Sequence, residues 1–239
     1  MSAPEVVVFA DPDALATAAA ERLLAELTSV QRAKGSVSVV LTGGGTGIAV
    51  LRAVRAAGSA LDWSKVDVYW GDERFLPAGH AERNETQARA ALLDHVAVDP
   101  ARVHPMAPSD GEFGDDPDAA AAAYAGLLGD SPVFDVLLLG VGEEGHTLSV
   151  FPDSPAVHST ESVVAVRDCP KPPPTRVSLT LPTARLATQV WLMATGAGKA
   201  DPIAAALSGV PEVDIPAAGA RGTEATVWFL DKAAAAKAP

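Results

Sequence analysis

The sequence predicts an α/β fold in which one mostly parallel sheet carries helices on both faces. Short β-rich runs alternate with helical segments along the whole chain, which is the pattern of parallel sheets covered by helices. The run Phe134–Leu139 is continuously apolar, as expected of a strand buried on both faces. The length of 239 residues and the absence of a linker-like stretch predict a single domain spanning residues 1–239.

The first half of the chain contains three strand–helix units. Helix starts are marked by capping residues, and helix bodies by apolar side chains three or four residues apart. The expected elements are the strand Val6–Phe9 with a helix after Asp11-Pro12-Asp13 up to Gly35, the strand Val37–Leu41 with the helix Ile48–Ala57, and the strand Val66–Trp70 with the helix Thr86–Val96.

The second half continues the alternation. Asp116-Pro117-Asp118 opens an alanine-rich helix that ends at Leu128. The later expected elements are the strands Phe134–Leu139, Val163–Val166, Val177–Leu181, Val190–Ala194 and Thr226–Leu230, the helix Ala200–Leu207 and a frayed terminal helix over Ala233–Ala238.

Charge and cysteine content limit the possible partners. The chain has 18 Lys and Arg against 30 Asp and Glu, a formal charge of −12, which repels nucleic acid and anionic membranes. The apolar run Val6–Ala10 is too short for a signal peptide or a membrane span, and the lone Cys169 cannot form an internal disulfide. We therefore expect a cytoplasmic protein. Because the chain is acidic overall, binding of an anionic ligand would require cations and backbone N–H groups gathered in one pocket.

The segment Thr42-Gly43-Gly44-Gly45-Thr46-Gly47 lies between a predicted strand and a predicted helix. Backbone N–H groups at such a turn can bind a phosphate or carboxylate, although a tight turn with positive φ would also explain glycine. Asp72 and Arg74 follow the next strand, and in a parallel sheet they face the same rim. A solvated charge cluster is the alternative reading for this pair.

The segment Gly140-Val141-Gly142-Glu143-Glu144-Gly145-His146 follows the buried strand and formally matches a dinucleotide-binding fingerprint. That reading is rejected because Glu143 and Glu144 stand where a pyrophosphate would approach, and Pro152 interrupts the following segment. What remains is a flexible turn that brings a carboxylate close to an imidazole, a pair suited to activating water near neutral pH. A purely structural histidine is the alternative.

Further candidate ligands of an anion are Lys171 in a proline-rich loop, Arg176 just after it, and Lys199 following glycines at a helix start. No metal site and no cofactor are expected, because the remaining histidines show no metal-ligand spacing with one another or with Cys169. Those histidines are His80, His95, His104 and His158.

With these motifs in place, the chain resembles the 6-phosphogluconolactonase family over nearly its whole length. The supporting segments are Thr42–Gly47, Gly71–Arg74, Gly140–Pro152, Pro170–Thr180 and Gly198-Lys199, of which Gly-His-Thr-Leu-Ser-Val-Phe-Pro at 145–152 is the most specific. The resemblance implies a Rossmann-like sheet shared with glucosamine-6-phosphate deaminase and ribose-5-phosphate isomerase.

The resemblance also implies a function: hydrolysis of a phosphosugar lactone in the pentose phosphate pathway, without a cofactor. It assigns His146 as general base, Glu144 as the acidic residue two positions before it, and Arg74 and Lys199 as contacts of the phosphorylated sugar acid. The family usually has Asp where Glu144 stands and Ser where Gly45 stands. Oligomeric state is expected to be a monomer or a weak homo-oligomer.

Two other functions remain open from the sequence. The deaminase branch shares the glycine turn and the Gly-His pair but continues with Asn-Glu-Pro, whereas this chain has Ser149-Val150-Phe151-Pro152. Lactone hydrolysis is therefore preferred over isomerisation or deamination of an amino sugar. The other possibility is a non-catalytic sugar-phosphate sensor.

Overall fold

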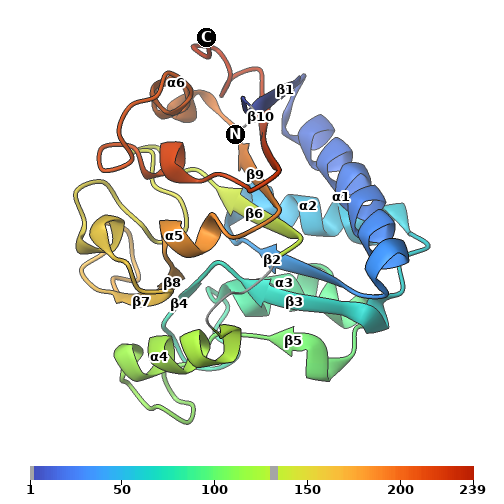
Figure 1. Cartoon of the computed structure of the whole chain (residues 1–239), viewed down its shortest axis with the longest axis vertical. Helices are drawn as coiled ribbons and strands as arrows, with labels where there is room; N and C mark the ends of the chain where they lie inside the picture. Colours follow the sequence, from blue (N-terminus) through green and yellow to red (C-terminus); the bar gives the residue numbers. More distant parts are fainter. Residues whose placement is uncertain (1–2, 130–133) are drawn as a thin grey trace.

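A computed structural model describes residues 3–129 and 134–239 and shows one seven-stranded sheet between two helical layers (Figure 1). The strand order is β1-β10-β9-β6-β2-β3-β5, and every pairing is parallel. These strands are β1 (Glu5–Phe9), β2 (Val37–Leu41), β3 (Val66–Trp70), β5 (Val103–His104), β6 (Val136–Gly140), β9 (Gln189–Ala194) and β10 (Ala225–Asp231). The predicted α/β class and parallel sheet are confirmed.

Helices cover both faces of the sheet, as predicted. The helices are α1 (Pro12–Lys34), α2 (Gly44–Ala57), α3 (Asn84–Ala91), α4 (Pro117–Leu128), α5 (Leu181–Ala184) and α6 (Ala200–Leu207). Apolar residues of α1, α2 and α3 share one core with one side of the strands, while those of α4, α5 and α6 share a second core with the other side. In Figure 1, α1 and α2 lie to one side of the sheet and α5 and α6 to the other.

The buried strand β6 shows why its sequence is continuously apolar. Val136 and Leu138 pack into the core beneath α1, whereas Leu137 and Leu139 pack into the opposite core. Successive side chains of a strand point to opposite faces, so a strand with both faces covered needs apolar residues at every position.

Two of the predicted strands lie outside the parallel sheet. β7 (Val163–Val166) and β8 (Arg176–Leu179) form a separate antiparallel sheet with β4 (Asp72–Arg74). This small sheet belongs to the same core as α4 and α5. The expectation that these two strands continue the parallel pattern was wrong, because strand propensity is alike in both kinds of sheet and pairing is decided by tertiary contacts.

Other differences concern boundaries and ends. α2 begins at Gly44, inside the glycine turn, and α3 ends at Ala91, earlier than the predicted Val96. The predicted terminal helix over Ala233–Ala238 is a series of turns. Within residues 3–129 and 134–239, no helix has the length and apolar character that crossing a bilayer requires.

Candidate active site

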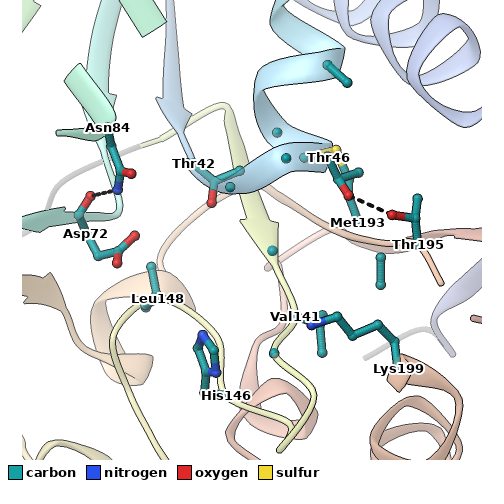
Figure 2. A pocket seen from close by; sticks show the side chains of 18 of the residues that line it. Thr42, Thr46, Asp72, Asn84, Val141, His146, Leu148, Met193, Thr195 and Lys199 are labelled. Carbon is teal, nitrogen blue, oxygen red and sulfur yellow. Dashed lines mark hydrogen bonds between the residues drawn. The ribbon is translucent and has the colours of Figure 1, made fainter. Parts of the chain in front are cut away.

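A cleft of about 430 Å³ opens at the carboxyl ends of β2, β6 and β9 (Figure 2). This is the edge of a parallel sheet at which ligands bind in open α/β folds. Most of the side chains predicted from the sequence meet here, although they come from segments far apart in the chain. The predicted residues that line the cleft are Thr42, Gly43, Gly44, Gly45, Thr46, Asp72, Arg74, His146, Arg176 and Lys199.

The glycine turn forms one wall of the cleft. A Cβ on Gly43 would lie 1.9 Å from Oδ1 of Asn84, and Gly44 has φ +77°, so both positions require glycine. Gly45 has neither constraint: a Cβ there would meet open space. The turn runs directly into α2, whose first N–H groups have no partner within the helix. Both the conformational and the anion-binding explanation of the glycines are therefore compatible with this geometry.

The loop after β6 fixes the position of His146. Gly142 N donates to His146 O at 2.8 Å, which closes the loop on itself, and the His146 ring stacks on Phe151 with centroids 4.4 Å apart. A Cβ on Gly142 would lie 1.9 Å from His146 Nδ1, so the ring packs directly on the glycine backbone. The imidazole is largely buried but lines the cleft.

Glu144 and Lys171 form a charged group beside the imidazole. Glu144 Oε2 lies 3.2 Å from His146 Nδ1 and accepts a hydrogen bond of 2.9 Å from Lys171 Nζ. The His146 contact satisfies the ion-pair distance, but its angle leaves Nδ1 without a well-formed hydrogen bond, so the interaction is mainly electrostatic. The extra methylene of Glu relative to Asp does not prevent the carboxylate from reaching the ring.

The protonation of this group follows from burial and charge. Burial is the largest influence on His146 and lowers its pKa below the usual 6.5, with Lys171 acting in the same direction and Glu144 against it. Burial alone would raise the pKa of Glu144, but the hydrogen bond from Lys171 and the neighbouring positive charges lower it to about 2. Near neutral pH the pair is thus a neutral imidazole beside an ionised carboxylate.

Asp72 and Arg176 lie buried at the junction of the cleft and the small sheet. Asp72 accepts a hydrogen bond of 2.6 Å from Ser149 Oγ, and its carboxylate is 4.0 Å from Arg176 Nη1. Arg176 also donates to the carbonyl oxygens of the proline-rich loop, Lys171 to Pro173, at 3.3 Å. Arg176 therefore fixes the loop that carries Lys171 as well as lining the cleft.

Arg74 is held in place by a buried carboxylate next to it. Glu73 accepts hydrogen bonds from the backbone N–H of Arg74, Asn84 and Glu85 at 2.7, 2.7 and 2.9 Å, which joins β4 to the start of α3. Burial raises the pKa of Glu73 to about 7, although the charge of Arg83 and the hydrogen bonds from these N–H groups act to lower it. The Arg74 side chain donates from Nη1 to the carbonyl oxygen of Glu82 at 2.7 Å.

Lys199 reaches the cleft from the turn after β9. Figure 2 shows its side chain extended toward Val141, on the side of the cleft where Thr46 and Thr195 share a hydrogen bond of 3.1 Å. Burial is the main cause that lowers the pKa of Lys199, and the nearby Lys171 adds to it. Asp231 accepts from Gly196 N at 3.0 Å and so anchors this turn.

Lys171 departs from its expected position. It does not line the cleft with the other cations but pairs with Glu144 at the back of His146. Sequence reasoning also left out three polar residues of the cleft: Asp13, Asn84 and Thr195. Asp13 is expected only as part of a helix start, and Asn84 lies just before the predicted helix Thr86–Val96, so neither is marked as a site residue by its sequence. Thr195 directly follows a predicted strand, and its place at the carboxyl end of β9 was the available signal.

The residues present do not suggest a metal ion. Across the described ranges, no three His, Cys, Asp or Glu side chains are grouped in a way that could hold one. The cleft offers a neutral imidazole with the Glu144 carboxylate beside it, three basic side chains, backbone N–H groups and the carboxylates of Asp13 and Asp72. This set suits proton transfer at an anionic substrate.

Comparison with known proteins agrees with the geometry. The family model described as glucosamine-6-phosphate isomerases/6-phosphogluconolactonase matches residues 10–228. Proteins named 6-phosphogluconolactonase from Streptomyces coelicolor and Mycobacterium tuberculosis are each 52% identical to the chain, covering 99% and 98% of it and 95% and 98% of their own lengths.

Solved structures show the same fold. A 6-phosphogluconolactonase from Trypanosoma cruzi superposes with a TM-score of 0.84 at 27% identity, covering 99% of this chain and 97% of that one. A monomeric glucosamine-6-phosphate deaminase shares the fold with a TM-score of 0.81 at 20% identity, covering 98% and 99%. Since the family model covers nearly all of the sequence that forms both the sheet and the cleft, the chain belongs to the glucosamine-6-phosphate isomerase/6-phosphogluconolactonase family.

Proposed function

We propose that the chain hydrolyses 6-phospho-D-glucono-1,5-lactone to 6-phosphogluconate, with His146 as the general base that activates the attacking water. The observation that carries the proposal is a neutral, largely buried imidazole facing a cationic cleft in an acidic protein. Relatives at 52% identity named 6-phosphogluconolactonase support the choice of substrate.

His146 has the protonation state that a base requires. Its Nδ1 is buried against Glu144, which leaves Nε2 as the nitrogen available to water in the cleft. When Nε2 takes a proton, the ionised Glu144 stabilises the imidazolium that forms. The carboxylate therefore favours the charged form that arises during the attack, while burial keeps the resting imidazole neutral.

The attack converts the lactone carbonyl into a tetrahedral oxyanion. Arg74 borders the cleft and can donate to this oxyanion together with backbone N–H groups; a single such donor contributes about 3 kcal/mol in comparable enzymes. The C–O bond of the ring then breaks, and His146 returns its proton to the ring oxygen, which becomes the hydroxyl of the open acid. Water is consumed and no cofactor takes part.

The phosphate end of the substrate is assigned to the opposite side of the cleft. The glycine turn Thr42–Thr46 offers backbone N–H groups and two hydroxyls, and Lys199 adds a positive charge. Arg176 contributes positive charge from the floor of the cleft, although much of its hydrogen bonding is used by the proline-rich loop. Lys171 acts on the substrate through Glu144 and His146 in this assignment.

The proposal is tested by acid release from freshly prepared lactone, measured at constant pH with wild type and His146→Ala. General-base catalysis contributes a factor of about 10² to 10⁴ to the rate, so the rate of hydrolysis by His146→Ala should be lower than that of wild type by this factor and approach the spontaneous rate of lactone opening. Equal rates in the two proteins would overturn the assignment of the base. Binding of 6-phosphogluconate without any acceleration of lactone opening would instead indicate a sensor, and conversion of glucosamine 6-phosphate, followed by mass spectrometry, would indicate the deaminase branch.

A further inference from the structure

A second cavity, of about 540 Å³, lies beside the cleft between α2 and α3. Arg52 of α2 and Ala90 and Ala91 of α3 line this cavity but not the cleft. Gly44, Gly45 and Arg74 line both spaces. The two spaces therefore adjoin at Arg74, although each has walls of its own.

The charge of this cavity is opposite to that of the whole protein. Among the residues that the structure describes, none with a carboxylate lines it, and neither Arg52 nor Arg74 forms an ion pair. Other arginines of this acidic chain do find carboxylates: Arg22, Arg89 and Arg102 pair with Glu or Asp at 2.7, 2.9 and 2.6 Å.

The polar atoms of Arg74 reinforce this contrast. Its Nη1 is bonded to a backbone carbonyl, and its buried Nε has no partner within the described part of the chain. Because that Nε is closed to the cavity, the donor of Arg74 left for an anion is Nη2, which forms no hydrogen bond to another described residue. Arg52 is exposed on α2, and no ion pair with another described residue occupies its guanidinium.

We propose that this second cavity is a binding subsite for a phosphate group, held by the guanidinium groups of Arg52 and Arg74. Guanidinium presents a planar fork of N–H donors that matches two phosphate oxygens, and two such forks suit a dianion. The ligand is orthophosphate or the phosphate of a small phosphomonoester. This subsite adjoins the position proposed for the lactone and shares Arg74 with it, whereas Arg52 belongs to the subsite alone. Binding there does not depend on hydrolysis.

The test is a titration followed by backbone-amide NMR at constant ionic strength, with orthophosphate in one arm and glycerol 3-phosphate in the other. The amides of Ala90 and Ala91 report the subsite, and those of Val141 and Gly142 report the cleft. We expect saturable shifts at Ala90 and Ala91 in at least one arm. Binding in both arms identifies a phosphomonoester site, and binding of orthophosphate alone identifies a site for the free ion.

Arg52→Gln should weaken the binding seen at Ala90 and Ala91 about tenfold, the loss expected for one charge-assisted contact, and leave the shifts at Val141 and Gly142 unchanged. Arg55→Gln is the matched control, since Arg55 is also exposed on α2 but does not line the cavity. The proposal is overturned if Ala90 and Ala91 show no saturable shift, if Arg52→Gln titrates like wild type, or if Arg55→Gln weakens binding equally.

Discussion

At the scale of single residues, the properties of His146 depend on two neighbours with opposite effects. Glu144 favours the imidazolium, whereas Lys171 disfavours it, and burial is the larger influence that holds the pKa below its usual value. Lys171 also pairs with Glu144, so the carboxylate remains ionised beside the ring. In the proposed mechanism, His146 is therefore neutral at rest, and its charged form is stabilised by Glu144 once it has accepted a proton.

This arrangement predicts the pH dependence of hydrolysis. Since His146, as the proposed general base, acts only when deprotonated, kcat/KM should rise with pH through a midpoint below 6.5. Glu144→Gln removes an influence that raises the pKa of His146, so the midpoint should move lower. Lys171→Gln removes an influence that lowers it, so the midpoint should move higher.

The pH profiles of kcat/KM in the wild type and the two variants check this. Lys65→Gln, which makes the same change of net charge as Lys171→Gln but at an exposed position outside the cleft, should leave the midpoint where it is. Shifts of the same sign in Glu144→Gln and Lys171→Gln would contradict the assignment of the acidic limb to His146.

At the scale of elements, the loop after β6 and the start of α2 each place backbone where a side chain would obstruct the site. Gly43 admits Asn84, and Gly142 admits the His146 ring. Gly43 leaves room for a side chain from another segment, α3, whereas Gly142 leaves room for a side chain further along its own loop. The glycine-rich sequence is thus a packing requirement of the site in addition to a source of N–H groups.

Gly142→Ala should displace the imidazole without unfolding the protein, because the ring borders the open cleft and can move toward it. A shift of about 1 Å at a reacting group can cost about 10²-fold in rate, so we expect kcat/KM to fall by that order while the circular dichroism spectrum is retained. The measurement is lactone hydrolysis at saturating and limiting substrate.

Gly126→Ala is the matched control. Gly126 is exposed within α4, and a Cβ there would meet open space. Alanine is favoured over glycine inside a helix by up to about 1 kcal/mol, so this variant should be slightly more stable with unchanged activity. Equal activity of Gly142→Ala and wild type would show that the contact with the ring does not position it.

At the scale of the whole molecule, one sheet separates two apolar cores that share its strands. Leu27 of α1 is fully buried in one core, and Leu179 of β8 is fully buried in the other. Because each central strand contributes side chains to both cores, loss of packing on one face removes support from the other. We therefore propose that residues 1–239 form a single cooperative domain.

Leu27→Ala and Leu179→Ala test this proposal. Each removes a fully buried side chain and should lower the free energy of unfolding by about 2 to 5 kcal/mol, while Leu127→Ala, at a residue that is 51% exposed, should change it little. Urea unfolding followed by tryptophan fluorescence and by circular dichroism should give one coincident transition in every variant. Two separated transitions in either core variant would mean that the two halves unfold independently.

The sequence alone determined the layered α/β architecture and most of the cleft. Hydrophobic periodicity and glycine-rich strand ends are local features of the sequence. Because the carboxyl ends of parallel strands meet at one edge of a sheet, these features predict that Thr42, His146 and Lys199 lie together. Local signals do not specify which strands pair. The assignment of β7 and β8 to an antiparallel sheet with β4 was therefore decided only in the tertiary structure.

The same limit applies to the charged side chains. Lys171 and Arg176 are five residues apart in sequence, yet one pairs with Glu144 and the other lies beneath the cleft beside Asp72. A long side chain reaches whichever partner the folded backbone brings within a few ångströms, and burial then sets the pKa. The sequence therefore determined which chemical groups are present at the edge of the sheet, and the tertiary structure decided which of them touch, because contacts between distant segments form only when the chain has folded.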